Sequence, residues 1–248
     1  MTLREEVTKK RQEYFETATT KEKIAYLIQY YGIRTILICI AALFIGSWIY
    51  HLITDPERIL SGTFVNYNLY DTTLNVDELE KDFLSAQKID ESEYMADFLT
   101  NITIVQSEET AEPQSVQTLY TQIASGVLDF AVADIEILKN YAYGYHFADL
   151  TTILSEEQIE IFKPYFLYVD IAVMEERQEK HEDIPLPDMR NPEAMVNPIP
   201  VLLDISNCPI IQEIYGENSS DICYGIIRKG EHQENAIKFL EYLSDEKH

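Results

Sequence analysis

The sequence predicts an α/β protein that begins with one long apolar helix and continues into an open mixed sheet with flanking helices. Three observations predict this. An apolar stretch occupies 36–53, helical and strand patterns alternate after it, and two expected helices end at a glycine, Gly126 and Gly144. We therefore divide the chain into a tail at 1–32, a transmembrane helix at 33–53, a stalk at 54–62 and an extracellular α/β domain at 63–248.

The apolar stretch has the length of a membrane span. It reads ILICIAALFIGSWIYHLI, and with the three residues before it covers 33–53. About 20 helical residues cross a hydrocarbon core about 30 Å thick. Only Arg34 and His51 can carry charge, and both lie near an end, where a side chain can reach the headgroups. The alternative is a buried core helix, which is rarely apolar on every side for so long.

Basic residues set the expected orientation. They precede the apolar stretch at Arg4, Lys9, Lys10, Arg11, Lys21, Lys23 and Arg34, whereas Arg58 alone occurs in the twenty residues after it. By the positive-inside rule, the N-terminus is cytoplasmic and the domain after the helix lies outside the cell membrane. A cleaved signal peptide is the competing interpretation, but the basic region and the apolar run are both too long for one.

Net charge excludes one class of partner. The chain carries a formal charge of -24, the first 34 residues carry +2, and the remainder therefore carries -26. Such a domain repels nucleic acid, so we exclude DNA and RNA as partners. The acidity could favour cationic ligands or metal ions, although general solubility is the simpler explanation.

The first half of the domain alternates strands and helices. Asp55-Pro56 and Ser61-Gly62 mark the stalk. The expected elements are a strand at Thr63–Leu69, a helix from Asn75 or Asp77 to about Ala86, a strand at Phe98–Val105, an acidic loop at Ser107–Pro113, a helix from Ser115 to Gly126 with Val116, Leu119, Tyr120 and Ile123 on one face, a strand at Leu128–Asp134 and a helix at Ile135–Gly144.

The second half is less regular. Ser155 is the expected N-cap of a helix with acidic residues in its first turn. A charged run, EERQEKHED, and five prolines make 175–200 an exposed loop in which proline forbids a central strand. The other expected elements are a strand at Phe166–Met174, an extended segment at Pro200–Ile205, a strand at Cys223–Arg228 and a terminal helix at Glu234–Leu243.

Two stretches carry a resemblance. LYTQIASGVLDFAVADIEILKNYAYGYHFADLTTIL joins a helix, a strand ending in an acidic residue, a helix and an Asp-Leu pair, with Asp129, Asp134, Asp149 and Leu150 at these positions. CYGIIRKGEHQENAIKFLEYL joins a strand, a turn and a helix that begins near Glu234 and Ala236. The chain thus resembles a truncated, membrane-anchored relative of the type II periplasmic or extracellular solute-binding proteins of Gram-positive bacteria. The resemblance implies their fold and a transporter as a partner, but no particular ligand.

Catalytic and metal-binding patterns are not evident in the sequence. The histidines, at 51, 146, 181, 232 and 248, do not have metal-ligand spacing, and the sequence contains neither a G-x-S-x-G motif nor a phosphate-binding loop. Glu179, Glu182 and Asp183 around His181 could hold a divalent ion, but a solvated charge run is the simpler interpretation. We expect no enzyme, no cofactor and no metal site.

The candidate ligand-binding residues are two aspartates and three tyrosines. Asp129 and Asp134 flank the expected strand at 128–134, and open α/β sheets bind ligands at strand ends. For Asp134, the N-cap of the following helix is the better interpretation. Tyr141, Tyr143 and Tyr145 alternate with small residues and could form a stacking surface for a sugar or a cation, or could pack under a loop.

Two cysteines lie in the domain. Cys208 and Cys223 could form a disulfide, whereas Cys39 lies in the expected membrane helix. Sequence separation alone does not show whether the two α-carbons come close enough.

Two functions stay open. The first is a single-pass membrane protein, in contact with the lipid bilayer, whose extracellular domain binds a small polar solute or peptide, alone or as an accessory to a transporter. The second is a structural or interaction module of a membrane complex without a small-molecule ligand. A polar cleft near Asp129, Asp134 and the tyrosines favours the first, and a packed core there favours the second.

Overall fold

The computed structural model describes residues 6, 9, 16–67, 74–104, 113–180 and 184–245. The side chains at 27, 30, 31, 33, 35, 49, 51–54, 113, 217 and 218 are not among those described. Most of the tail before residue 16, most of the acidic loop expected at 107–113 and the end of the charge run, at 181–183, also lie outside the described residues. The chain forms two compact units, Met1–Asp55 and Pro56–His248.

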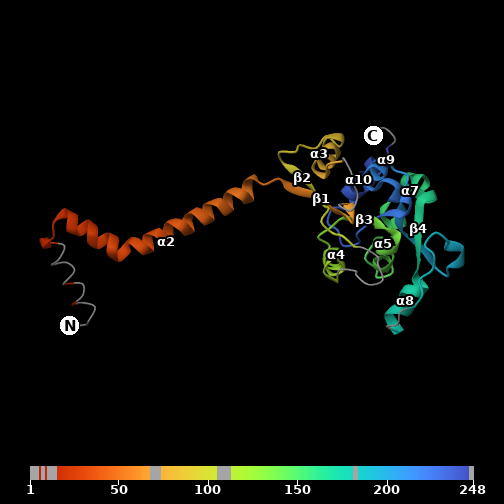
Figure 1. Ribbon diagram of the computed structural model, residues 1–248, viewed down its shortest axis with the longest axis horizontal. Helices are drawn as coiled ribbons and strands as arrows, with labels where there is room; N and C mark the ends of the chain where they lie inside the picture. Colours follow the sequence, from red (N-terminus) through yellow and green to blue (C-terminus); the bar gives the residue numbers. More distant parts are fainter. Residues whose placement is uncertain are drawn as a thin grey trace. The chain divides into compact units, whose positions relative to one another are not determined.

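The first unit contains one long helix, α2, which runs over 35 residues from Thr20 to Thr54 (Figure 1). Its apolar side chains at 36–38 and 43–45 are each at least 56% exposed. Judged on the residues that the structure describes, no helix is both long and apolar enough to cross a membrane. The transmembrane helix expected at 33–53 is therefore not confirmed and stays a prediction.

The second unit is built on a sheet whose six described strands have the order β2-β1-β3-β6-β5-β4. The strands are β1 Glu57–Phe64, β2 Tyr94–Leu99, β3 Phe130–Asp134, β4 Phe166–Asp170, β5 Pro198–Asp204 and β6 Ile222–Ile226. Strand β1 pairs in parallel with β2 and β3, whereas the pairs β3–β6, β6–β5 and β5–β4 are antiparallel. The predicted open mixed sheet is thus confirmed.

Helices cover both faces of the sheet (Figure 1). One face packs against α3 Val76–Ala86, α6 Leu150–Ile153, α7 Glu156–Phe162, α9 Pro209–Tyr215 and α10 Gln233–Ser244. The other face packs against α4 Pro113–Ser125, α5 Ile135–Ala142 and α8 Ile171–Lys180. Short 3-10 turns lie at Lys163–Tyr165, Pro192–Ala194 and Gly216–Asp221. Each face therefore has its own apolar core, and the sheet separates the two.

Aromatic rings dominate the core on the α3 and α10 side. The ring of Phe130 lies 4.9 to 5.9 Å from four other rings, those of Phe64, Phe98, Tyr224 and Phe239. Gly62 lies against the same ring, because a Cβ at this position would come within 2.1 Å of it. The Ser61-Gly62 pair is therefore part of strand β1 and not a stalk turn, and its glycine makes room for Phe130.

Helix boundaries agree with the sequence signals. The Asn75 side chain accepts the Asp77 N–H at the start of α3, and Ser155 with Gln158 forms a complete capping box on α7. Gly126 follows α4 with φ +73°, the left-handed conformation that glycine adopts without strain. These three predictions are confirmed.

Two expected strands start too late. Strand β1 begins at Glu57 and ends at Phe64, so it covers most of the expected stalk and little of Thr63–Leu69. Strand β2 ends at Leu99, and the buried Ile102 and Ile104 follow it outside any strand. Both strands open on exposed or half-buried residues, so hydrophobicity placed them too far along the chain.

Asp170 ends β4, and the strand expected to reach Met174 is therefore too long. Its carboxylate accepts the N–H of Ala172 at 3.0 Å, which starts helix α8. It also accepts the N–H groups of Val196 at 2.7 Å and Asn197 at 3.0 Å, just before β5. One buried side chain thus joins a strand end, a helix start and the proline-rich segment.

Proline does not prevent strand β5 from forming inside the sheet. Pro198 and Pro200 pair with β4 residues, whereas pairing with β6 begins only at Leu203. At the prolines, β5 pairs with β4 but not with β6, so the missing proline N–H groups interrupt no pairing on the β6 side. The prediction that proline forbids a strand throughout 175–200 is wrong at this point.

Replacing Glu80 by Gln is expected to stabilise the domain at high pH. Burial raises the pKa of Glu80 from 4.5 to about 7, although its Oε1 accepts the Phe98 N–H at 2.6 Å. Because the folded-state pKa lies above the unfolded one, stability is lost as the pH rises from about 5 to 8. Glutamine keeps the acceptor without the charge, so its gain is about 1 to 2 kcal/mol at pH 8, after allowance for half-exposure.

Urea denaturation at pH 5 and pH 8 measures this gain. Glu78→Gln, at an exposed position of the same helix, is the control and should change stability by less than about 0.5 kcal/mol at either pH. Equal stability of Glu80→Gln and wild type at pH 8 would contradict the prediction.

Candidate functional site

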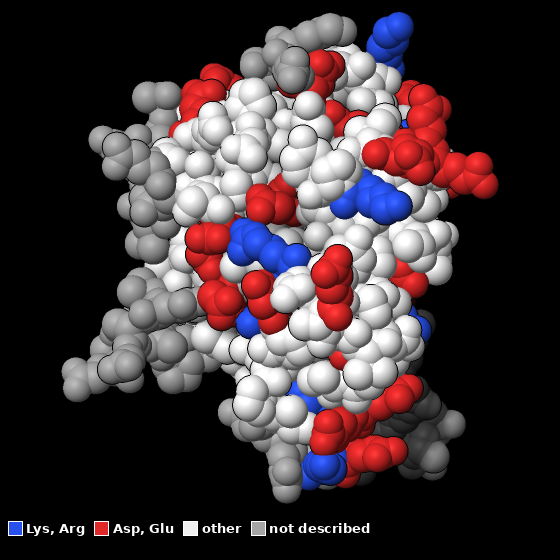
Figure 2. Space-filling model, turned by 90° about the vertical axis from the view of Figure 1, so that its right-hand side faces the viewer, with Lys and Arg blue, Asp and Glu red and all other residues white. Residues whose placement is uncertain are grey.

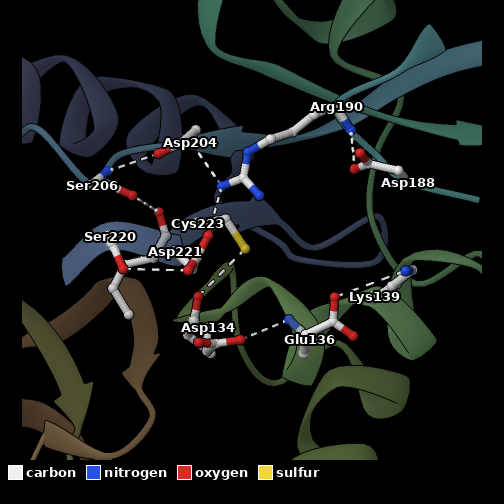
Figure 3. Close-up of polar contacts among 12 residues, drawn as sticks. Asp134, Glu136, Lys139, Asp188, Arg190, Asp204, Ser206, Ser220, Asp221 and Cys223 are labelled. Atoms are coloured by element: carbon white, nitrogen blue, oxygen red, sulfur yellow. Dashed lines mark hydrogen bonds and ion pairs between the residues drawn. The ribbon is translucent and has the colours of Figure 1, made fainter. Parts of the chain in front are cut away.

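Acidic side chains are spread over the face of the molecule drawn in Figure 2, with basic side chains set among them. Near one edge of the sheet, acidic and basic groups are in direct contact (Figure 3). Asp204 ends β5 and Asp221 immediately precedes β6. Arg190 Nη2 lies between them and donates to Asp204 Oδ2 at 3.0 Å and to Asp221 Oδ1 at 3.1 Å. This guanidinium is therefore already occupied by carboxylates of the protein itself.

Asp134 lies at the same edge and caps helix α5. Its carboxylate accepts the Glu136 N–H at 2.8 Å, so its N-cap interpretation is confirmed (Figure 3). Burial raises the pKa of Asp134, the charges of Asp221 and Glu136 raise it further, and Arg190 opposes them. The edge therefore has an excess of negative charge.

Asp129 lies inside the domain, away from solvent. Its Oδ2 accepts the Ser61 N–H at 2.7 Å, and its Oδ1 accepts the His232 N–H at 2.8 Å. The His232 ring Nδ1 lies 3.3 Å from Oδ2. Asp129 thus joins strand β1 to the start of α10, and its known contacts are structural.

The three candidate tyrosines do not share one surface. Helix α5 ends at Ala142, and the turn after it directs the rings differently. Tyr141 lines a cavity, Tyr143 is buried with its hydroxyl accepting the Asp170 N–H at 3.4 Å, and Tyr145 is half-buried with φ +61°. Of the three tyrosines, Tyr141 is the one that faces the cavity described next.

That cavity lies in the groove between α4 and α5 and has a volume of about 670 Å³. It is lined by Ile104, Val116, Gln117, Tyr120, Glu136, Ile137, Asn140, Tyr141, Gly144 and His146. Helix α4 precedes β3 and α5 follows it, so both helices begin at the carboxyl edge of the parallel strands. Ile104, Val116 and Glu136 therefore line the end of the groove that lies at this edge. This is the edge at which open α/β sheets bind ligands.

Three rings form the aromatic wall of the cavity: Tyr120, Tyr141 and His146. The Tyr120 centroid lies 6.4 Å from that of Tyr141 and 5.4 Å from that of His146, the latter with the rings nearly perpendicular at 87°. Burial lowers the pKa of His146, and the charge of Lys229 lowers it further. Burial also raises the pKa of Tyr141. The wall is therefore uncharged at neutral pH.

Polar groups complete the lining. Gln117 on α4 and Asn140 on α5 offer amide donors and acceptors, and Glu136 offers a carboxylate. Apolar rings beside a few polar groups are typical of sites for small molecules. The cavity could therefore bind a ring or a compact polar group.

The expected apolar face of α4, formed by Val116, Leu119, Tyr120 and Ile123, is only partly buried. Leu119 and Ile123 are buried, but Tyr120 is 48% exposed and Val116 is 37% exposed. The apolar face of α4 is wider than the part of it that packs against the domain. The width of this face is the feature of the sequence that could have indicated a cavity beside α4. His146 and Gln117 carried no pattern that marked them.

The disulfide considered between Cys208 and Cys223 is not formed, since both thiols are free. The Cys208 side chain packs on the α10 face and lies 3.9 Å from Ser244 Oγ. Cys223 packs on the opposite face and its thiol donates to the Ala133 carbonyl at 3.4 Å. The sheet therefore lies between the two sulfur atoms.

Within the described ranges, no three His, Cys, Asp or Glu side chains are placed to hold a metal ion. The sheet edge around Arg190 has charged side chains that already pair with one another, whereas the α4–α5 cavity is a space in which a small molecule could fit.

No protein-family model and no curated protein matches the chain. Two solved structures are distantly similar. An ABC substrate-binding protein from Listeria monocytogenes, in complex with cycloalternan, is 12% identical, with 77% of this chain and 76% of that chain covered and a TM-score of 0.36. The substrate-binding domain of a protein described as a molybdenum ABC transporter, from Clostridium difficile, is 9% identical, with coverages of 77% and 93% and a TM-score of 0.34. Scores this low carry no argument for this chain.

Proposed function

We propose that the domain after the apolar helix binds a small polar solute without catalysis, in the α4–α5 cavity. The observation that carries the proposal is the cavity itself, about 670 Å³ with three aromatic rings on one wall. Small-molecule sites range from about 300 to 1,000 Å³. The resemblance of the sequence to type II solute-binding proteins is a second, independent support.

Thermal unfolding of the full chain with amino acids, sugars, amines and short peptides tests this function. A solute at 100 times its dissociation constant adds about 2.7 kcal/mol, which raises the melting temperature by about 5 to 10 °C. Tyr120→Leu should abolish the rise, whereas Tyr165→Leu, at an exposed position that does not line this cavity, should keep it. If no class of solute changes the melting temperature, the proposal fails.

We further propose that the apolar helix anchors the chain in the cell membrane, with the N-terminus cytoplasmic and the domain outside. The support is the sequence: 36–53 contains no Asp, Glu, Lys or Arg, and seven basic residues precede 35. A transporter that receives the solute is the partner implied by the resemblance.

Protease added to intact cells is expected to digest the domain and to spare the tail. Immunodetection of a C-terminal tag and of an N-terminal tag measures the two outcomes, and permeabilised cells serve as the control in which both tags are lost. A protected C-terminal tag on intact cells would contradict the orientation.

A second candidate function is an interaction module without a solute. It is favoured by Asp129 and Tyr143, two expected ligand contacts that are buried and bonded within the domain. In this alternative the α4–α5 cavity receives a side chain of a membrane partner, and the solute panel produces no shift.

A further inference from the structure

The lining of the α4–α5 cavity includes both a carboxylate and three aromatic rings. Tyr120, Tyr141 and His146 present rings at different inclinations, 34° between the two tyrosines and 87° between Tyr120 and His146. Tyr120 is 48% exposed and Tyr141 is 8% exposed, so Tyr120 offers more accessible ring surface than Tyr141 does. Ring faces carry negative electrostatic potential and attract cations.

Glu136 is the charged group of this lining. Among the described residues that line the cavity, it is the one with a carboxylic acid side chain, and burial lowers the pKa of His146, the other candidate for a charge. Its side chain is 61% exposed, and its ion pair with Lys139 is long, at 3.8 Å. The Lys139 side chain is 17% exposed, but the long separation makes the pair weak, and the exposed Glu136 carboxylate stays accessible to another cation.

Of the two nearby lysines, Lys139 pairs with Glu136, whereas Lys229 is directed elsewhere. Lys229 Nζ donates to the Ala124 carbonyl at 3.2 Å, near the end of α4, and does not line the cavity. The residues after 34 carry a formal charge of -26, which raises the local concentration of cations.

Resting on the proposed function, we infer that the solute bound in the α4–α5 cavity carries an alkylammonium group, placed against Tyr120 and Tyr141 and paired with Glu136. Gln117 and Asn140 are left for the neutral polar end of the solute. A sugar could stack on the rings and donate hydroxyl hydrogen bonds to Glu136, but an alkylammonium group adds a full positive charge that both the rings and the carboxylate attract.

Calorimetric titration of the full chain in detergent, at pH 7.5 and low salt, tests the inference. The probes are choline, its uncharged isostere 3,3-dimethyl-1-butanol, and glucose. Choline is expected to bind at least tenfold more tightly than the isostere. Glu136→Gln should weaken choline about three- to tenfold and leave the isostere unchanged, and Tyr120→Leu should weaken choline about tenfold or more. Tyr165→Leu is the matched control and should bind choline as wild type does.

Every other outcome contradicts a specific part of the inference. If the isostere binds as tightly as choline, or if Glu136→Gln binds choline normally, the ammonium preference is wrong. If glucose binds in a Tyr120-dependent way and choline does not, the cavity is a solute site but the ligand class is wrong. If neither these probes nor the wider solute panel binds, the proposed function fails as well. Unfolding curves of each variant separate lost binding from lost folding.

Discussion

Asp170→Asn is expected to lower the free energy of unfolding by about 2 to 4 kcal/mol at pH 7. The wild-type carboxylate is 3% exposed and accepts the N–H groups of Ala172, Val196 and Asn197. An amide presents N–H donors of its own in place of one of its two acceptors, so at least one backbone N–H is left buried without a partner. Urea denaturation of the variant and of wild type measures the loss.

The same variant has a defined pH dependence. Burial alone would raise the pKa of Asp170, but the three backbone N–H donors outweigh it and hold the pKa below its usual value. The stabilisation is therefore complete above the unfolded pKa of about 4 and is lost as the pH falls through the folded pKa. The difference between wild type and variant should shrink below about pH 4. Glu193→Gln, at an exposed position on the same segment, is the control; a loss for Asp170→Asn no larger than for this control would contradict the role of Asp170.

Phe130→Ala is expected to lower the free energy of unfolding by about 3 to 5 kcal/mol and the melting temperature by about 10 °C. Phe130 has no exposed surface and contacts four rings, and Gly62 beneath it cannot fill the space that its ring leaves. Calorimetric or circular-dichroism melting measures the change.

Ile161→Ala provides the comparison for Phe130→Ala. Ile161 is exposed on α7, so its truncation should cost less than about 1 kcal/mol. If Phe130→Ala costs no more than Ile161→Ala, the aromatic cluster is not the stabilising core of this face.

Helices could be predicted because their signals are local. Asn75, Ser155 and Gly126 mark helix ends by hydrogen bonds or backbone angles formed within a few residues. Strands were harder, since partner strands decide where pairing begins. Glu57 and Arg58 start β1 although both are exposed, and nothing in their own sequence shows that β2 pairs with them.

The end of β4 shows the same limit. The apolar residues after Asp170 continue the strand pattern, but Asp170 receives N–H groups from Val196 and Asn197, more than twenty residues away in sequence. The sequence does not show that these residues contact Asp170, so the change from strand to helix could not be predicted there.

The candidate site was predicted in part. Tyr141 was expected to bind and does line the cavity, whereas Tyr143 and Asp129 are buried in contacts that only the tertiary structure brings together. Tyr120 was placed on the same helix face as Leu119 and Ile123, which are buried, yet Tyr120 is 48% exposed. Whether a neighbouring helix covers such a face is decided by the packing of α4 and α5 and not by the periodicity of α4.

Hydrogen exchange of the full chain, with and without the solute that raises its melting temperature, tests most directly that the α4–α5 cavity is the binding site. Slower exchange is expected for amides of Pro113–Ser125 and Ile135–Ala142, with β4 and α9 unchanged. Slower exchange confined to β4, β5 or α9, or no change in α4 and α5 at a saturating concentration of that solute, would contradict the proposed site.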